Sequence, residues 1–200
     1  MIDTQPSRRP IGLGIFLILA GVIGWWAAFQ LTVEKFSLLT NPNEQLGCDF
    51  SLLVQCKANL ESWQGSLFGF PNPILGITGW VAVIVVGAAL PAGAKFSRWF
   101  WILFNIGIVG ALALVIWLIS QSIFVLITLC PWCMVTWSVT IPVFWAVTLR
   151  NLSTGVIPTP PALRRVFTAA YGWVPVITIV SYLIVAIIAQ VRLDVLSTLF

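Results

Sequence analysis

Residues 130–149 read CPWCMVTWSVTIPVFWAVTL. This stretch is an uncharged, largely apolar run that begins on a Cys-x-x-Cys motif and ends before Arg150. Pro131 is favourable at the first position of a helix, where its missing N–H has no partner to lose. A helix from Pro131 to Leu149 is about 28 Å long, close to the thickness of the hydrocarbon core of a bilayer. We therefore expect a membrane-spanning helix with two cysteines at its start.

The rest of the chain also has the composition of a membrane protein. Of 200 residues, 60% are hydrophobic and 8% are charged, whereas soluble proteins are about a quarter charged. Further apolar runs of spanning length lie at about 11–33 and 73–90, from 99 to the polar residues 120–122, and at 171–190. The sequence predicts an all-α integral membrane protein, with a four-helix transmembrane bundle and a fifth transmembrane helix.

Basic residues are unequally divided between the two sides of these spans. An N-terminus inside the cell makes seven of them cytoplasmic: Arg8, Arg9, Lys95, Arg98, Arg150, Arg164 and Arg165. The other three lie outside: Lys35, Lys57 and Arg192. This division satisfies the positive-inside rule. The net charge of +4 is therefore a topology signal and does not indicate a nucleic-acid partner.

The spans divide the chain into four parts. Residues 1–10 are expected to be a cytoplasmic N-terminus. Residues 11–149 are expected to form a catalytic bundle that includes the extracytoplasmic loop 34–72. A cytoplasmic linker at 150–170 then precedes the fifth transmembrane helix and a short tail at 171–200.

Four cysteines are the obvious reactive groups of a chain without histidine. Cys130 and Cys133 lie at i and i+3 on one helix face, and a helix N-terminus favours the reactive thiolate. Cys48 and Cys56 lie in the outer loop, where we expect a solvent-accessible pair of the labile, catalytic kind. Two pairs on one membrane face predict a relay. A soluble thiol protein reduces the outer pair, the outer pair reduces the inner pair, and a lipid-soluble quinone accepts the electrons.

The sequence also allows other interpretations of the cysteines. They include static disulfides and a four-cysteine zinc site, although the seven residues between Cys48 and Cys56 do not fit zinc spacing, and we expect no metal. The alternative function is a non-enzymatic membrane scaffold or a small transporter with structural disulfides. Transporters usually place ionisable groups at midplane, and none lies within the expected spans. Thiol trapping before and after addition of quinone separates these classes, because a scaffold shows no quinone-dependent change.

The segment after Cys56 has an apolar repeat at helical spacing, formed by Leu60, Trp63, Leu67 and Phe70. The repeat predicts a one-sided helix that lies flat on the membrane surface. Such a helix either covers a hydrophobic pocket between the spans or only packs on the bundle.

Four polar or aromatic residues are candidates for contacts inside this region. Ser62 lies beside the apolar stripe and is placed to donate a hydrogen bond inward. Asn72, between two prolines, either caps the next helix or binds a quinone carbonyl. Trp137 lies one turn after Cys133 on the same face, where its indole N–H can reach a ligand, although interfacial aromatic residues are common. Asn105 is expected to join two helices through a hydrogen bond.

Taken in order, these motifs resemble the vitamin K epoxide reductase family, in its bacterial disulfide-forming branch. The resemblance covers roughly residues 11–149 and rests on three features: Cys48-x7-Cys56, the segment from Ser62-Trp63-Gln64 to Asn72-Pro73, and Cys130-Pro131-Trp132-Cys133. It implies a four-helix bundle around a quinone pocket in the bacterial inner (cytoplasmic) membrane, and a quinone-dependent thiol–disulfide oxidoreductase activity that supports disulfide bond formation.

The resemblance also implies a role for each cysteine. Cys48 is the one first attacked by the partner protein, Cys130 exchanges with Cys56 through a mixed disulfide, and Cys133 is the thiolate that faces the quinone. Unrelated quinone-linked disulfide oxidases have the Cys-x-x-Cys pair first and the wider pair second, whereas here the order is reversed.

Three further residues and the partner follow from the same resemblance. Asn72 matches the asparagine that binds the quinone, either menaquinone or ubiquinone. Ser62 matches a serine near the shuttle pair, and Trp137 stands where vertebrate members have tyrosine. Because the chain ends at Phe200 without a thioredoxin-like domain, we expect a separate, exported, DsbA-like thioredoxin-fold partner.

Overall fold

The computed structural model describes residues 11–196, within which it consists of helices and loops with no strand. The expectations for residues 1–10, with Arg8 and Arg9, and for residues 197–200 lie outside the described part of the chain. Five of its helices are long and apolar enough to cross a membrane: α1 (Ile11–Thr40), α3 (Asn72–Ala89), α4 (Arg98–Gln121), α5 (Pro131–Ser153) and α7 (Val174–Leu193). The predicted all-α membrane bundle with a fifth spanning helix is confirmed.

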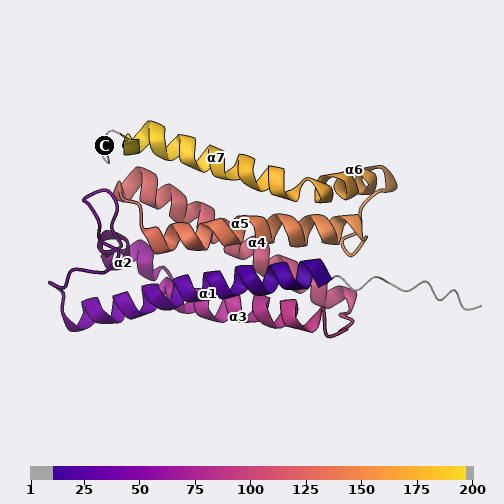
Figure 1. Cartoon of the computed structure of the whole chain (residues 1–200), viewed down its shortest axis with the longest axis horizontal. Coiled ribbons are helices and arrows are strands. Elements are labelled where there is room, and N and C mark those ends of the chain that lie inside the picture. The colour runs from indigo at the N-terminus through magenta and orange to yellow at the C-terminus, as the bar shows by residue number, and fades with distance from the viewer. Residues whose placement is uncertain (1–10, 197–200) are drawn as a thin grey trace, which may run out of the picture.

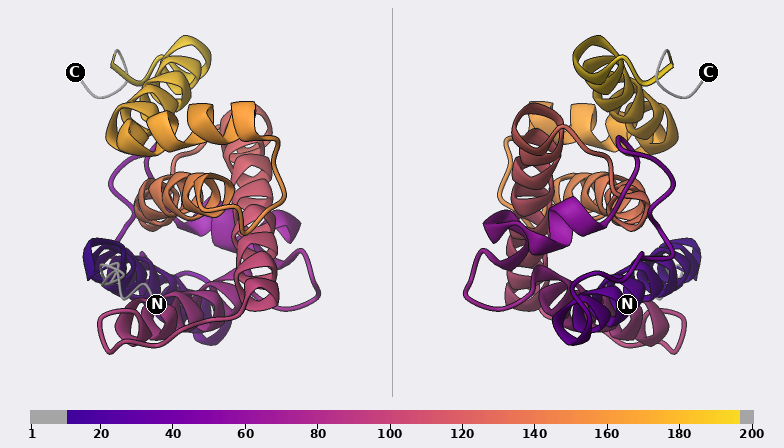
Figure 2. Two further views of the ribbon diagram at one scale, coloured as in Figure 1. Left: turned by 90° about the vertical axis from the view of Figure 1, so that its right-hand side faces the viewer. Right: turned by 90° about the vertical axis from the view of Figure 1, so that its left-hand side faces the viewer.

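Helix α5 lies at the centre of the bundle. It packs against α1, α4 and α7, and α1 packs along α3. Helix α4 crosses the others diagonally (Figures 1 and 2). Although α3 and α4 are consecutive in the chain, they have few direct contacts. A cavity lies between these two helices and α5.

The pairing of α1 with α3 depends on glycines at their crossing. A Cβ atom on Gly14 would lie 2.8 Å from the carbonyl oxygen of Gly87, and one on Gly24 would lie 2.2 Å from the ring of Trp80. Small residues let two helix backbones approach closely, which is a common way of joining transmembrane helices. The core beneath this contact includes Leu17 and Val143, which are almost fully buried.

Several element bounds differ from those expected. Helix α1 continues to Thr40, beyond the expected end near residue 33, although charged and hydroxyl-bearing residues interrupt the apolar run there. The expected linker at 150–170 contains part of an amphipathic helix, α6 (Pro161–Gly172), which packs on α5. Its first residue is Pro161, and proline is favourable at the start of a helix. Helix α4 ends in a π-helical turn, η2 (Ser122–Leu126).

The two ends of the bundle differ in chemistry. At one end Arg98 Nε donates to the carbonyl oxygen of Val156 at 2.8 Å, and Arg164 Nε donates to that of Ser153 at 2.8 Å. The start of α5, with its two cysteines, and the loop that follows α1 lie at the opposite end (Figure 1). The thiol chemistry is therefore confined to one end of the bundle.

Candidate active site

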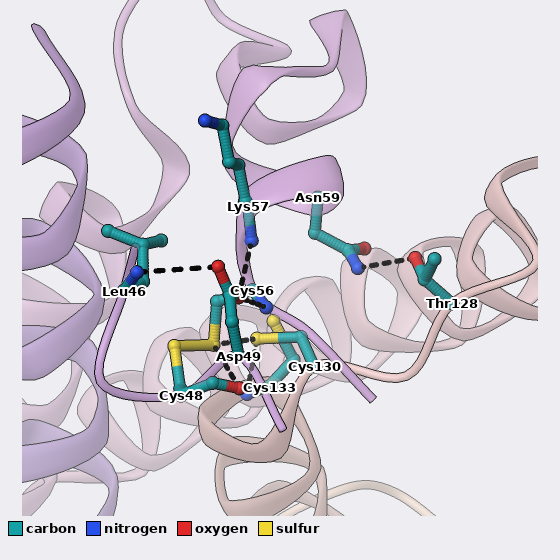
Figure 3. The surroundings of a disulfide bond; sticks show 9 residues. All are labelled: Leu46, Cys48, Asp49, Cys56, Lys57, Asn59, Thr128, Cys130 and Cys133. Carbon is teal, nitrogen blue, oxygen red and sulfur yellow. Dashed lines mark hydrogen bonds between the residues drawn. A yellow bond between two sulfur atoms is a disulfide. The ribbon is translucent and has the colours of Figure 1, made fainter. Parts of the chain in front are cut away.

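All four cysteines meet at the outer-loop end of the bundle. Cys48 and Cys56 form a disulfide, with their Cα atoms 5.8 Å apart, whereas Cys130 and Cys133 are free thiols. The Sγ of Cys130 lies 3.3 Å from the Sγ of Cys56. Figure 3 shows the disulfide beside the two free thiols. The two pairs that the sequence placed on one face are therefore in contact.

The outer disulfide is buried, which corrects the expectation that it is solvent-accessible. Cys48 is 2% exposed and Cys56 is 0% exposed. They pack with Leu31, Leu38 and Leu46, from the outer half of α1 and the start of the loop. The polar neighbours of the cysteines in sequence suggested exposure, but the extension of α1 to Thr40 covers the pair with apolar side chains. A protein that attacks Cys48 must therefore first displace this cover.

Asp49 fastens the loop that carries the disulfide. Its Oδ1 accepts from the amides of Cys56 at 2.8 Å and Lys57 at 3.3 Å, and its Oδ2 accepts from the amide of Leu46 at 3.4 Å (Figure 3). Lys57 also begins the short helix α2 (Lys57–Glu61). A single carboxylate thus joins the two ends of the disulfide loop.

A second connection joins the loop to the segment before α5. The amide of Gln55 donates to the carbonyl oxygen of Leu129 at 3.0 Å, and the amide of Leu129 donates to that of Leu53 at 2.8 Å. Ile127, just before this bridge, has a left-handed backbone (φ 54°), which is unfavourable for a β-branched residue. This turn and the bridge bring Cys130 alongside Cys56.

Cys130 caps the start of α5. Its backbone is extended, and its Sγ accepts from the amide of Cys133 at 3.4 Å. The hydrogen bond with the Cys133 thiol, followed by the bonds from the amides of Cys133 and Trp132, lowers the pKa of Cys130, although burial and the charge of Asp49 act in the opposite direction. The thiolate is the nucleophile in disulfide exchange. The helix start therefore activates the cysteine that contacts Cys56.

A cavity of about 870 Å³ extends from this site into the bundle. Its wall is mostly apolar and comes from α1, α3, α4, α5 and the segment after Cys56. Cys133 lies in the wall, whereas Cys130 does not. The two inner thiols therefore face different neighbours, one the disulfide and the other the cavity.

The segment after Cys56 is not the continuous amphipathic helix that the apolar repeat predicted. Helix α2 stops at Glu61, Ser62 is extended, and a 3-10 turn, η1 (Trp63–Ser66), follows. Leu60 is buried, but Trp63 is 65% exposed. Gly65 and the left-handed Gly69 were the signals against a long helix, because glycine weakens helices. The segment nevertheless contributes to the cavity wall.

The three predicted ligand residues all line the cavity. Ser62 caps η1 because its Oγ accepts from the amide of Gly65 at 3.3 Å, and the same hydroxyl donates to the carbonyl oxygen of Asn59 at 2.7 Å. Asn72 is the first residue of α3 and does not cap it; instead, its Oδ1 accepts from the amide of Leu67 at 3.0 Å and its Nδ2 donates to the carbonyl oxygen of Gln64 at 2.6 Å. One Nδ2 hydrogen of Asn72 is left for a ligand. Trp137 is 6% exposed.

Sequence reasoning missed further polar residues in the cavity wall. They come from the segment after Cys56 and from the end of α4, and they are Asn59, Gln64, Gln121 and Ser122. Nothing in their local sequence links them, because they meet only when the two segments fold together. Among residues 11–196, no group of three or more His, Cys, Asp or Glu side chains is arranged to hold a metal ion.

The class of protein follows from the contact between the Cys130 thiol and the Cys48–Cys56 disulfide, with Cys133 in the wall of an apolar cavity among membrane-spanning helices. These features define a membrane thiol–disulfide oxidoreductase. Residues 15–148 match the family model described as the Vitamin K epoxide reductase family. The chain belongs to this family, whose members use quinone and generally work with a thioredoxin-fold partner. A comparison with curated proteins gave no match.

Proposed function

We propose that this protein is a quinone-dependent thiol–disulfide oxidoreductase of the bacterial inner membrane. It reoxidises an exported, DsbA-like thioredoxin-fold partner, which is a separate protein, and so supports disulfide bond formation in exported proteins. The catalytic unit is residues 11–149, with the loop 34–72 and all four cysteines on the extracytoplasmic side and the N-terminus in the cytoplasm. Residues 150–170 connect this unit on the cytoplasmic side to the fifth transmembrane helix.

The observation that carries this proposal is the 3.3 Å contact between Cys130 and Cys56, together with the place of Cys133 in the cavity wall. Disulfide exchange requires a thiolate next to a disulfide sulfur. Electron transfer to a lipid-soluble acceptor requires a thiol at the acceptor's binding site. Cys130 meets the first requirement, because it lies next to a disulfide sulfur, and Cys133 meets the second, because it lies in the cavity wall.

The relay begins at the outer pair. The partner's thiolate attacks Cys48, and a second partner thiol completes the exchange, so that the partner leaves with a disulfide and Cys48 and Cys56 become thiols. Cys56 then attacks Cys130 of the oxidised inner pair. The Cys130–Cys133 bond breaks, a Cys56–Cys130 bond forms, and Cys133 leaves as a thiolate. Attack of Cys48 on Cys56 restores the outer disulfide and releases Cys130.

Two electrons and two protons now reside on the inner thiols. The quinone accepts the two electrons and the two protons, and Cys130 and Cys133 are left joined by a disulfide. Before that last transfer, the relay requires an outer disulfide and two inner thiols, the arrangement described above.

The cavity suits a quinone. Its volume of about 870 Å³ lies in the range of small-molecule sites, about 300–1,000 Å³, which are mostly apolar with a few placed polar groups. The free Nδ2 hydrogen of Asn72 and the indole N–H of Trp137 are the proposed donors to the ring oxygens. Ser62 acts through the segment that it caps.

Thiol trapping of the purified protein with short-chain ubiquinone or menadione tests this proposal. Quinone is expected to convert the two free thiols of the wild type into a disulfide. In the variant Cys133→Ser, reduction of quinone should stop, whereas the partner should still exchange with Cys48. In the matched variant Cys48→Ser quinone should still oxidise the inner thiols, but partner oxidation should stop. Turnover of quinone by the variant Cys133→Ser would show that the role assigned to Cys133 is wrong.

A further inference from the structure

Several polar side chains in the cavity wall already have hydrogen-bond partners. Asn59 Oδ1 accepts from Ser122 Oγ at 2.9 Å, and its Nδ2 donates to Thr128 Oγ1 at 3.0 Å. Ser62 Oγ donates to the carbonyl oxygen of Asn59 and accepts from the amide of Gly65 at 3.3 Å. These bonds hold the segment after Cys56 against the end of α4, and every side-chain oxygen in them has a partner.

Two glutamines in the same wall are different. Gln64 Nε2, from η1, donates to Gln121 Oε1, at the last residue of α4, at 3.3 Å. No residue among 11–196 accepts from the Gln121 amide nitrogen, and the Gln64 Oε1 is buried without a partner. Gln64 itself is 4% exposed. Unpaired buried polar atoms are rare and costly. The buried Gln64 Oε1, together with the unpartnered Gln121 Nε2 in the same cavity wall, therefore points to a ligand.

The hydrogen bond between the glutamines determines which atom is left for that ligand. Because Gln64 occupies Oε1 of Gln121, the group that remains on Gln121 is the Nε2 donor. A quinone ring carries carbonyl acceptors and needs donors. We propose that Gln121 Nε2 donates a hydrogen bond to a quinone carbonyl oxygen and that Gln64 is a positioning residue that fixes the Gln121 amide. This inference rests on the proposed function, because it assigns a second set of contacts in the same cavity.

The Gln64–Gln121 pair can also bind the reduced form of the quinone, which carries hydroxyl groups. The oxygen and nitrogen of a terminal amide exchange places by half a turn about the last side-chain bond, with little change in shape. When both amides turn, the Gln64–Gln121 hydrogen bond is kept with donor and acceptor exchanged. Gln121 then presents Oε1 to the cavity and accepts from a hydroxyl group. The same two residues thus match a ligand that binds with carbonyls and leaves with hydroxyls.

The test compares three glutamine-to-methionine variants of the full chain, which remove the amide and keep the side-chain length. Gln121→Met and Gln64→Met probe the pair. Gln190→Met is the matched control, since Gln190 lies on α7, outside the cavity wall, where it bonds Asp194 and Leu196. The probe is a short-chain ubiquinone. Its KM is measured by turnover with a reduced partner, and its Kd by quenching of tryptophan fluorescence.

Gln121→Met is expected to raise both KM and Kd about fivefold to tenfold, the effect of one lost hydrogen bond, with a smaller effect on kcat. Gln64→Met should raise them less, and the double variant no more than Gln121→Met alone, because Gln64 acts through Gln121. Gln190→Met should leave both values unchanged. Reduction of the outer disulfide by dithiothreitol, which needs no quinone, should be the same in all variants.

The outcomes separate this inference from the proposed function. If the wild type reduces quinone but Gln121→Met keeps wild-type KM and Kd, the role of Gln121 is wrong and the proposed function stands. If the wild type binds quinone without reducing it, the proposed function is wrong. The role of Gln121 is then tested by Kd alone, through the comparison of Gln121→Met with the wild type. If the wild type neither binds nor reduces quinone, both are wrong. Additive effects of the two substitutions would overturn the positioning role of Gln64.

Discussion

The thiol of Cys130 lies 3.3 Å from the Sγ of Cys56, and the two residues are 74 positions apart in the chain. Both are fully buried. A thiolate at Cys130 is therefore next to one sulfur of the outer disulfide, and attack there releases Cys48. The contact also works in reverse, because the same two sulfurs meet when Cys56 attacks an oxidised inner pair. The loop that holds Cys56 and the helix start that holds Cys130 set this distance.

The first prediction concerns pH. The pKa of Cys130 is lowered, chiefly by the hydrogen bond with the Cys133 thiol. Exchange with the outer disulfide should therefore speed up as pH rises through the pKa of Cys130 and level off above it, with a midpoint below the pKa of about 8.5 of a free cysteine. Ultraviolet absorbance of the thiolate measures the titration. In Cys133→Ala the midpoint should move upward, and an unchanged midpoint would contradict the assigned cause.

The second prediction concerns the loop fastened by Asp49. Asp49→Ala removes the acceptor for the amides of Leu46, Cys56 and Lys57. Hydrogen bonds to charged groups contribute about 1.5–3 kcal/mol, so dithiothreitol should reduce the Cys48–Cys56 disulfide about tenfold faster. The time course of thiol appearance without quinone measures this.

A control for this experiment lies in the same loop. Glu44→Ala removes a carboxylate that accepts from the exposed Ser37 hydroxyl at 2.6 Å, away from the disulfide. It should leave the rate of reduction unchanged. Equal rates for Asp49→Ala and the wild type would show that Asp49 does not restrain the loop.

The third prediction concerns stability at the opposite end of the bundle. Asn151 is fully buried; its Nδ2 donates to Asn105 Oδ1 at 3.2 Å and to the carbonyl oxygen of Trp101 at 3.3 Å. Asn151→Leu should lower the free energy of unfolding by about 2–3 kcal/mol, because it leaves buried groups without partners. Thermal unfolding in detergent measures the change. Adding Asn105→Leu should cost less than the sum of the single losses, and strict additivity would contradict the coupling.

Much of the fold followed from local sequence. Apolar runs fixed the spans, and Pro131 fixed the start of α5 at the residue where the structure has it. The hydrogen bond between Asn105 and Asn151 bears out the prediction that Asn105 joins two helices. The extension of α1 to Thr40 and helix α6 were missed, because hydropathy detects the bilayer and not the polar turns that continue beyond it.

The site was predictable only in part. The order and spacing of the cysteines indicated that two pairs meet, because both flank spans that end on one face. The burial of Cys48 was not predictable, since its cover comes from Leu31 and Leu38 on the outer half of α1. The Gln64–Gln121 pair joins segments 57 residues apart, and the local sequence of neither segment shows that the two side chains meet. Contacts of this kind arise from tertiary packing and have no local signature.

The most direct test of the account is disulfide formation between Cys56 and Cys130. In the double variant Cys48→Ser, Cys133→Ser these two cysteines are the only thiols in the chain. Mild oxidation of the purified protein should join them within one molecule, which mass spectrometry of the linked peptides detects. We predict near-complete formation of the Cys56–Cys130 bond. Two thiols that stay free, or that pair only between molecules, would contradict it.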